Sequence, residues 1–306
     1  MIPENKDCLD FLSTVDTESV DLVLTDPPYF IGVDGGKGWD SQWKTEQEYL
    51  DWCLLWTKEC VRVLKPNRCL YVWGTTKTDT FLRYKLDILN SFDEMVYQNW
   101  IIWSYDWGGR TKKTFARKHE DLLMYSKGQE FLFNADDVCV ERSVKNDMSL
   151  TRRIKLLEKR LEGKLVLEEN GQDTKDGTAY KTYGLDKIDD SDVESKIEQF
   201  KQKETDFGKG KVPTDVWNKN NHTTEKEYCG WHPTQKPISL LERIIKANTN
   251  QGDTVLDIFS GSGSTAIASA NCSRKFIGCE RDGEYHEKSI DRIQELIGLL
   301  WFMGGE

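Results

Sequence analysis

The sequence lacks the features that mark membrane, secreted and metal-dependent proteins. No run of 18 consecutive apolar residues occurs in the 306-residue chain, so no helix is expected to cross a bilayer. The segment Met1–Asp7 lacks the apolar core of a secretory signal. Only four histidines are present, and the eight cysteines form no C-x-x-C pair. We therefore expect a cytoplasmic protein with reduced thiols and no metal centre.

The net charge of −10, averaged over the chain, argues against a nucleic-acid partner. The charge is uneven, because residues 1–60 hold 13 acidic and 4 basic side chains and the remainder is nearly neutral. Local basic patches are therefore still compatible with a polyanionic partner. One stretch predicts phosphate contacts, with a solvated charged surface as the alternative; its basic residues are Arg110, Lys112, Lys113, Arg117 and Lys118.

Strand and helix patterns alternate in two blocks, which predicts an α/β protein with a layered, mostly parallel sheet. The first block, over residues 8–138, has a predicted helix at Gln47–Leu64 and predicted strands at Val20–Thr25, Leu70–Trp73, Asn99–Ser104 and Leu122–Tyr125. The second block, from about residue 232, has predicted helices at Pro237–Lys246, Ser264–Ala270 and up to about Leu299, and predicted strands at Thr254–Ile258 and Lys275–Cys279.

The segment between the blocks differs in composition. Residues 139–212 contain 16 basic and 16 acidic side chains and few aromatic ones. Such dense charge is typical of a solvated surface or a mobile insertion. Within it, Thr151–Lys164 has helical spacing, with Leu156 and Leu157 on the apolar side.

A glycine turn between a predicted strand and a predicted helix suggests a nucleotide-type ligand. Gly261 and Gly263 allow a sharp turn, and the helix that follows offers free backbone N–H groups to an anion. Glu280 closes the next strand, where a carboxylate can accept both ribose hydroxyls. The spacing also fits a dinucleotide fingerprint or a turn without a ligand. Because only 26 residues follow Glu280, a smaller nucleoside fits better than a dinucleotide.

A second turn, Asp26-Pro27-Pro28-Tyr29, follows the strand Val20–Thr25. Its two prolines fix φ and restrict the residues before them, so the side chains keep fixed relative positions. Asp26 and the Pro27 carbonyl could each accept a hydrogen bond from one N–H of the exocyclic amine of a planar base, and the ring of Tyr29 could stack on that base. Two acceptors would make the amine lone pair available for attack on a methyl donor. A rigid loop without a chemical role is the alternative.

The order of these motifs resembles a known family. Asp-Pro-Pro-Tyr precedes the Phe259-Ser-Gly-Ser-Gly263 turn by about 230 residues, and His232-Pro-Thr-Gln-Lys-Pro237 lies before the second block. The chain resembles the β class of amino-group DNA methyltransferases, which methylate adenine N6 or cytosine N4 using S-adenosylmethionine. Two departures stand out: Ile258 replaces the family's usual proline, and only six residues precede Asp7 where the family has a strand.

The resemblance implies a permuted Rossmann-like methyltransferase fold. Residues 1–138 would be the catalytic half, 139–225 an inserted target-recognition region, and 226–306 the cofactor-binding half. The catalytic residues that it implies are Asp26, Pro27, Pro28 and Tyr29. The cofactor-binding residues that it implies are Asp7, Thr234, Lys236, Asp257, Phe259, Gly261, Gly263, Ser264, Thr265 and Glu280.

The resemblance also implies DNA as substrate, with the target base flipped out of the duplex. The glycine-rich segment Gly32–Trp43 could close over that base or be an ordinary flexible loop. Arg152 and Arg153 are candidates for DNA contacts. His119 and Glu120 are interpreted as structural, because amine methylation needs no histidine base, and His232 as a residue that orders its loop.

Asp26 favours adenine N6 over cytosine N4, because the cytosine enzymes of the family more often carry serine at that position. Methylation of cytosine N4, methylation of RNA adenine, and a non-catalytic DNA-binding subunit remain alternatives, and a dinucleotide oxidoreductase is disfavoured. A homodimer, a cognate restriction endonuclease, and a prokaryotic or phage origin are further expectations.

Overall fold

The chain folds into two compact units. The computed structural model describes residues 2–105, 111–140, 150–169, 172–182, 184–206, 212–218 and 227–303. One unit joins the two ends of the chain, Met1–Val138 and Thr214–Glu306, and the other is Cys139–Pro213. The inserted unit ends before the predicted boundary at 225, because the strand β7 (Val216–Asn218) pairs in parallel with the main sheet.

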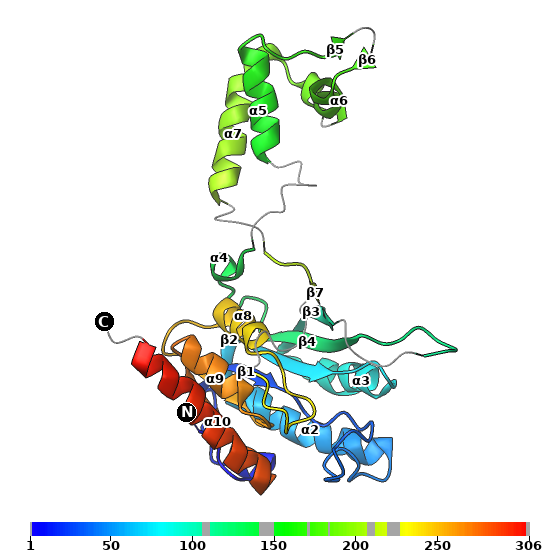
Figure 1. Cartoon of the computed structure of the whole chain (residues 1–306), viewed down its shortest axis with the longest axis vertical. Coiled ribbons are helices and arrows are strands. Elements are labelled where there is room, and N and C mark those ends of the chain that lie inside the picture. Colours follow the sequence, from blue (N-terminus) through cyan, green and yellow to red (C-terminus); the bar gives the residue numbers. More distant parts are fainter. Residues whose placement is uncertain are drawn as a thin grey trace. The chain divides into compact units, whose positions relative to one another are not determined.

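The larger unit is built on a seven-stranded sheet in the order β7-β3-β4-β2-β1-β8-β9 (Figure 1). Its central strand β1 pairs in parallel with β2 on one side and with β8 on the other. The strand β4 runs antiparallel to both β2 and β3. The prediction of a mostly parallel, permuted sheet is thus confirmed. The strand bounds are β1 Val20–Thr25, β2 Leu64–Gly74, β3 Met95–Ser104, β4 His119–Lys127, β8 Thr254–Asp257 and β9 Lys275–Gly278.

Alternating side chains of each strand enter two separate cores, as the two-residue period of a strand requires. In β1, Val23 lies in the core beneath α1 (Cys8–Leu12), α2 (Glu46–Val63) and α3 (Thr80–Arg83). Leu22 and Leu24 lie in the core beneath α8 (Ile238–Asn248) and α9 (Ser264–Asn271). Helices therefore cover both faces of the sheet, and α10 (Gly283–Met303) packs against α9.

Some predicted boundaries differ from the observed ones. The strand β2 begins at Leu64, directly after α2, and its register against β1 shifts between Leu64 and Cys69. The irregular stretch accommodates Pro66, which cannot donate to a regular ladder. Pro237 caps α8 from an extended conformation instead of forming its first turn. At the other end of the sheet, Glu4 forms a single parallel bridge with Cys279, beside the end of β9.

Short elements complete the larger unit. They are η1 (Tyr84–Ile88), η2 (Leu89–Ser91) and α4 (Ala135–Val138). Across the described ranges, no helix combines the length and the apolar character needed to span a membrane.

The inserted unit has its own small core, which explains why it forms a separate compact body. Helices α5 (Leu150–Leu161) and α7 (Val193–Asp206) bury Leu156, Leu157 and Val193 between them. The predicted helix at Thr151–Lys164 is therefore present but ends three residues early. The remaining elements are β5 (Glu168–Glu169), β6 (Gln172–Asp173), α6 (Lys175–Thr182), η3 (Leu185–Lys187) and η4 (Asp190–Asp192).

Candidate active site

The two turns singled out in the sequence line one cleft of about 1450 Å³. This proximity follows from the topology, because β1 and β8 are parallel neighbours and their carboxyl ends meet at the same edge. Asp26, Pro27, Pro28 and Tyr29 line the cleft from the β1 side. The predicted cofactor residues that line it are Asp7, Thr234, Phe259, Gly261 and Glu280.

The glycine turn requires glycine for two physical reasons. Gly261 has φ +46°, and a Cβ there would lie 2.6 Å from the Nε2 atom of His232. Gly263 has φ +77°, and a Cβ there would lie 2.9 Å from Ile293. Both the left-handed backbone and the close neighbours exclude a side chain at these positions. The turn therefore presents bare backbone to the cleft at Gly261, whereas Gly263 is packed against α10.

Asp257 stabilises this turn from behind the cleft. Its carboxylate accepts hydrogen bonds from Thr265 Oγ1 at 2.6 Å, Phe259 N at 3.0 Å and Thr25 Oγ1 at 3.2 Å. Burial raises the pKa of Asp257 to about 7. Ser264, which precedes Thr265 in the chain, accepts a hydrogen bond from Arg292 at 3.1 Å. The sequence placed Asp257, Gly263, Ser264 and Thr265 among the cofactor residues, but none of the four lines the cleft, and their contacts hold the turn in shape.

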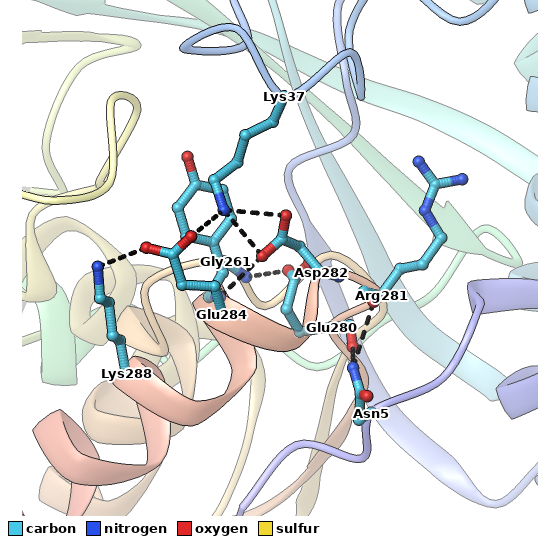
Figure 2. Close-up of polar contacts among 9 residues, drawn as sticks. Asn5, Lys37, Gly261, Glu280, Arg281, Asp282, Glu284 and Lys288 are labelled. Carbon is cyan, nitrogen blue, oxygen red and sulfur yellow. Dashed lines mark hydrogen bonds and ion pairs between the residues drawn. The ribbon is translucent and has the colours of Figure 1, made fainter.

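Glu280 supports the same turn from the cleft side (Figure 2). Its Oε2 atom accepts a hydrogen bond from Gly261 N and its Oε1 atom one from Asp282 N, both at 2.8 Å. Burial raises the pKa of Glu280. A carboxylate oxygen has two lone pairs, so each oxygen can accept one further bond from a ligand hydroxyl. Asp7 lies nearby and caps α1 by accepting from Leu9 N at 2.9 Å.

At the other turn, four polar side chains form a group that we call the catalytic cluster, namely the buried Lys236 and the half-buried Asp26, Tyr29 and Glu120. The Tyr29 hydroxyl donates to Asp26 Oδ1 at 2.5 Å. Lys236 Nζ lies 2.5 Å from Asp26 Oδ2 and 3.1 Å from Glu120 Oε2. Lys236 was predicted among the cofactor residues, and the structure places its ammonium beside Asp26, which was predicted as catalytic.

The charges of the catalytic cluster depend on one another. Burial lowers the pKa of Lys236, but the attraction of Asp26 and Glu120 outweighs it and the pKa is raised. Burial raises the pKa of Glu120, against the opposing attraction of Lys236. Burial also raises the pKa of Tyr29, so its hydroxyl keeps the proton that it donates to Asp26. The cluster therefore holds Asp26 as an oriented hydrogen-bond acceptor.

Glu120 was interpreted as structural, and sequence reasoning missed its place in the cluster. The direction of β4 in the sheet could have indicated the position of Glu120. β4 runs antiparallel to β2, with Gly74 opposite Asp121, so β4 begins at the edge where β1 and β2 end. Polar residues at the start of β4 therefore lie beside the residues that follow β1 and β2.

His232, which the sequence analysis interprets as ordering the loop before Pro237, packs against the glycine turn. Its ring lies against Gly261 and 4.7 Å from the ring of Tyr285, and Thr234 N donates to its Nδ1 at 3.4 Å. Burial lowers the pKa of His232 to about 3, so the ring is neutral at physiological pH.

The glycine-rich segment Gly32–Trp43 is tied down at two points. The buried carboxylate of Asp40 accepts hydrogen bonds from the backbone N–H groups of Phe30, Ile31 and Val33, at 2.7, 3.0 and 2.9 Å. Figure 2 shows Lys37 reaching the start of α10, where its ammonium lies 3.1 Å from Asp282 and 2.8 Å from Glu284. The loop therefore has a defined conformation at the rim of the cleft.

The predicted DNA-binding residues are spread over several places. Arg117 lines the cleft and donates to Thr76 Oγ1 at 2.7 Å. Lys112 and Lys113 are exposed, and Lys118, between Arg117 and β4, is half-buried. Arg152 and Arg153 lie on α5 of the inserted unit, and Arg110 lies outside the described residues.

Several proteins of known name are similar in sequence to this chain over most of its length. The chain is 30% identical over 292 residues to the DNA adenine methyltransferase YhdJ of Escherichia coli K12, covering 94% of this chain and 80% of that protein. It is 30% identical to the type II methyltransferase M1.MboII of Moraxella bovis, covering 91% and 90% of the two chains. It is 28% identical to M.HpaI of Haemophilus parainfluenzae, covering 92% and 70%.

Solved structures share the fold at lower identity. The PvuII DNA methyltransferase (cytosine-N4-specific) superimposes with a TM-score of 0.62 at 17% identity, covering 97% of this chain and 90% of that one. The M1.HpyAVI–SAM complex superimposes with a TM-score of 0.53 at 19% identity, covering 95% and 98%. The model of the N6/N4 DNA methylase family matches residues 20–291. This chain therefore belongs to the N6/N4 family of DNA methylases.

Proposed function

We propose that this protein transfers a methyl group from S-adenosylmethionine to the exocyclic N6 amine of adenine in DNA. The observation that carries the proposal is that the Asp26–Tyr29 turn and the bare backbone of Gly261 line the same cleft. The name of the relative YhdJ, a DNA adenine methyltransferase, supports the choice of base.

The cleft residues fit the cofactor chemically. Gly261 has no side chain, and its backbone lines the cleft where a ligand can approach it closely. Glu280 keeps lone pairs for ribose hydroxyls, and Asp7 and Phe259 line the same region. The volume of about 1450 Å³ exceeds that of an ordinary single-ligand pocket, which leaves room for a flipped base as well.

The catalytic turn activates the amine. When bound, the cofactor supplies an electrophilic methyl group on a positively charged sulfur. Asp26 and the Pro27 carbonyl would each accept a hydrogen bond from one N–H of the amine, and these two hydrogen bonds localise the lone pair on the nitrogen. That lone pair forms the N–CH₃ bond as the S–CH₃ electron pair returns to sulfur, and the nitrogen becomes positively charged. Asp26 then takes the amine proton and later releases it to water.

Cytosine N4 is the second candidate base, because the PvuII enzyme named as cytosine-N4-specific shares the fold. The deciding experiment is transfer of labelled methyl from S-adenosylmethionine to unmethylated genomic DNA, followed by nucleoside analysis. N6-methyladenine is the expected product, and N4-methylcytosine would overturn the choice of base. Binding of S-adenosylmethionine without any label in the DNA would favour an RNA substrate or a non-catalytic subunit. Binding of a labelled nicotinamide cofactor would instead indicate an oxidoreductase.

The tether of the glycine-rich segment should affect cofactor affinity. Lys37→Ala removes the ammonium between Asp282 and Glu284, which frees the segment Gly32–Trp43 at the rim of the cleft. We expect the Kd for S-adenosylmethionine to rise about fivefold, the scale of a partly exposed ion-pair network. Isothermal titration calorimetry measures the change.

Lys288→Ala is the matched control, because Lys288 also pairs with Glu284, at 2.6 Å, from the neighbouring turn of α10. It should leave the Kd unchanged. Equal effects of the two variants would mean that the charge of Glu284, and not the tether, affects binding.

The inserted unit is proposed as the target-recognition region. Its helix α5 carries Arg152 and Arg153, and its separate core allows it to be replaced. We expect a chain in which a flexible linker replaces Cys139–Pro213 to keep a folded core and its cofactor affinity while losing sequence selectivity. Methylation mapping on genomic DNA measures this, and a retained recognition sequence would assign recognition to the larger unit.

The proposed function extends to the substrate of the protein, its partners and its location. DNA is the macromolecular substrate, and the exposed Lys112 and Lys113 would contact its phosphates. Relatives named as type II methyltransferases support a cognate restriction endonuclease in the same system. The cysteines in the described ranges are unpaired, which is consistent with cytoplasmic thiols, and a homodimer remains part of the proposal.

A further inference from the structure

Glu120 is a second carboxylate beside the catalytic turn, and the methyl-transfer step described above does not use it. Its Oε2 atom lies 3.1 Å from Lys236 Nζ and 3.3 Å from the Tyr29 hydroxyl. The side chains of Glu120 and Lys236 are only 17% and 5% exposed. Lys236 Nζ is also 2.5 Å from Asp26 Oδ2, so two carboxylates share one ammonium.

The charges in the cluster do not cancel. Asp26 and Lys236 by themselves would form a neutral pair, and Glu120 leaves the catalytic cluster with one net negative charge. An excess carboxylate in a poorly hydrated site costs free energy unless a positive charge offsets it. His232 is neutral at physiological pH, and the guanidinium of Arg117 is exposed at the rim and donates to Thr76. The arrangement therefore favours a ligand that brings a positive charge.

We propose that Glu120 is a positioning residue whose negative charge balances the positive charge carried first by the cofactor sulfur and then by the methylated amine. This inference rests on the proposed function, since only methyl transfer from a sulfonium places such a charge beside Asp26. Glu120 acts through Lys236 and Tyr29, which hold it next to Asp26, and Asp26 is the group that touches the amine. A fixed negative charge where a cation develops lowers the barrier without reorganisation.

The test compares two ligands that differ by one methyl group and one positive charge, S-adenosylmethionine and S-adenosylhomocysteine. Calorimetry gives the Kd of each for the wild type and for Glu120→Gln, which removes the charge but keeps the shape. We expect the preference for the charged ligand to fall about threefold in Glu120→Gln, the effect of one charge several ångströms away in a partly hydrated site. Glu120→Asp, which restores the charge, should restore most of the preference.

Glu242→Gln is the matched control, because Glu242 is 23% exposed on its side chain, pairs with Lys246 and does not line the cleft. It should leave the affinity ratio unchanged. Equal loss of affinity for both ligands in Glu120→Gln would assign Glu120 a purely structural role, and unchanged affinities for both ligands would remove it from the reaction. Either result overturns the inference.

A measurement on the wild-type protein covers the case in which Glu120→Gln fails to fold. Sinefungin carries an amine in place of the methylated sulfur, and its ammonium should make it bind more tightly than S-adenosylhomocysteine. Tighter binding of S-adenosylhomocysteine than of sinefungin would contradict the inference. A wild-type protein that binds none of the three ligands would contradict the proposed function itself, which keeps the two failures distinguishable.

Discussion

Asp26→Ala is expected to lower the rate of methyl transfer by about 10³-fold or more while the Kd for S-adenosylmethionine changes only a few-fold. The alanine removes the acceptor that orients the amine and takes its proton, and losses of this size follow removal of one preorganised polar group. The cofactor would contact Gly261 and Glu280 instead, which belong to the other turn. Single-turnover transfer of labelled methyl, together with calorimetry, separates the two effects.

Asp51→Ala is a suitable control for that experiment. Asp51 is an exposed aspartate on α2 that accepts a hydrogen bond from Gln47 and does not line the cleft, so its loss should leave both measurements unchanged. If Asp26→Ala instead weakened cofactor binding by orders of magnitude, Asp26 would belong to the cofactor site and the assignment of the catalytic turn would be wrong.

Lys236→Met is expected to destabilise the folded protein in a pH-dependent way. Without the ammonium, the carboxylates of Asp26 and Glu120 remain close together in a buried site. Removing one partner of a buried ion pair costs about 3–5 kcal/mol, which corresponds to a loss of roughly 5–10 °C in Tm for a chain of this size. Thermal unfolding of wild type and variant measures the difference.

The sign of the pH dependence follows from Glu120. Burial raises its pKa in the folded protein, and the loss of Lys236 removes the attraction that opposes this rise. A group whose folded-state pKa lies above its unfolded value contributes stability at low pH, and that contribution is lost as the pH rises through the folded pKa. The deficit in Tm of Lys236→Met should therefore be small near pH 5 and larger near pH 8.

Lys246→Met is the control for the lysine substitution, because Lys246 is 43% exposed and its nearest carboxylate, Glu242, is 3.8 Å away. Its effect should stay within about 0.5 kcal/mol at every pH. A deficit of Lys236→Met that does not vary with pH would show that lost packing, not uncompensated charge, destabilises the variant.

The two turns could be predicted from sequence because their chemistry is local. Asp26–Tyr29 is stiffened by its own two prolines, and Gly261 has a conformation that glycine adopts readily. In both cases the residues that define the feature are adjacent in the chain, so a short pattern contains the whole signal. The strand Val20–Thr25 and the following helix were predictable for the same reason.

The place of Lys236 could not be predicted in that way. It lies 210 residues from Asp26, in the segment just before α8, and only the folded structure brings the two side chains within 2.5 Å. Its sequence neighbours, Thr234 and Pro237, instead suggested the cofactor. The hydrogen bonds of Asp257 could not be predicted for a similar reason, because its position in the glycine motif does not reveal that its carboxylate accepts from Thr25 and Thr265.

The central position of β1 has a consequence for how the protein is made. Its two neighbours in the sheet are β2, which is synthesised soon afterwards, and β8, which follows some 230 residues later. One edge of β1 therefore stays open on the ribosome while the inserted unit, with its own core, is translated and can fold. Unpaired edges of this kind are sites of aggregation. Pausing or truncation between the two blocks should thus be more harmful to yield than the same event after β9.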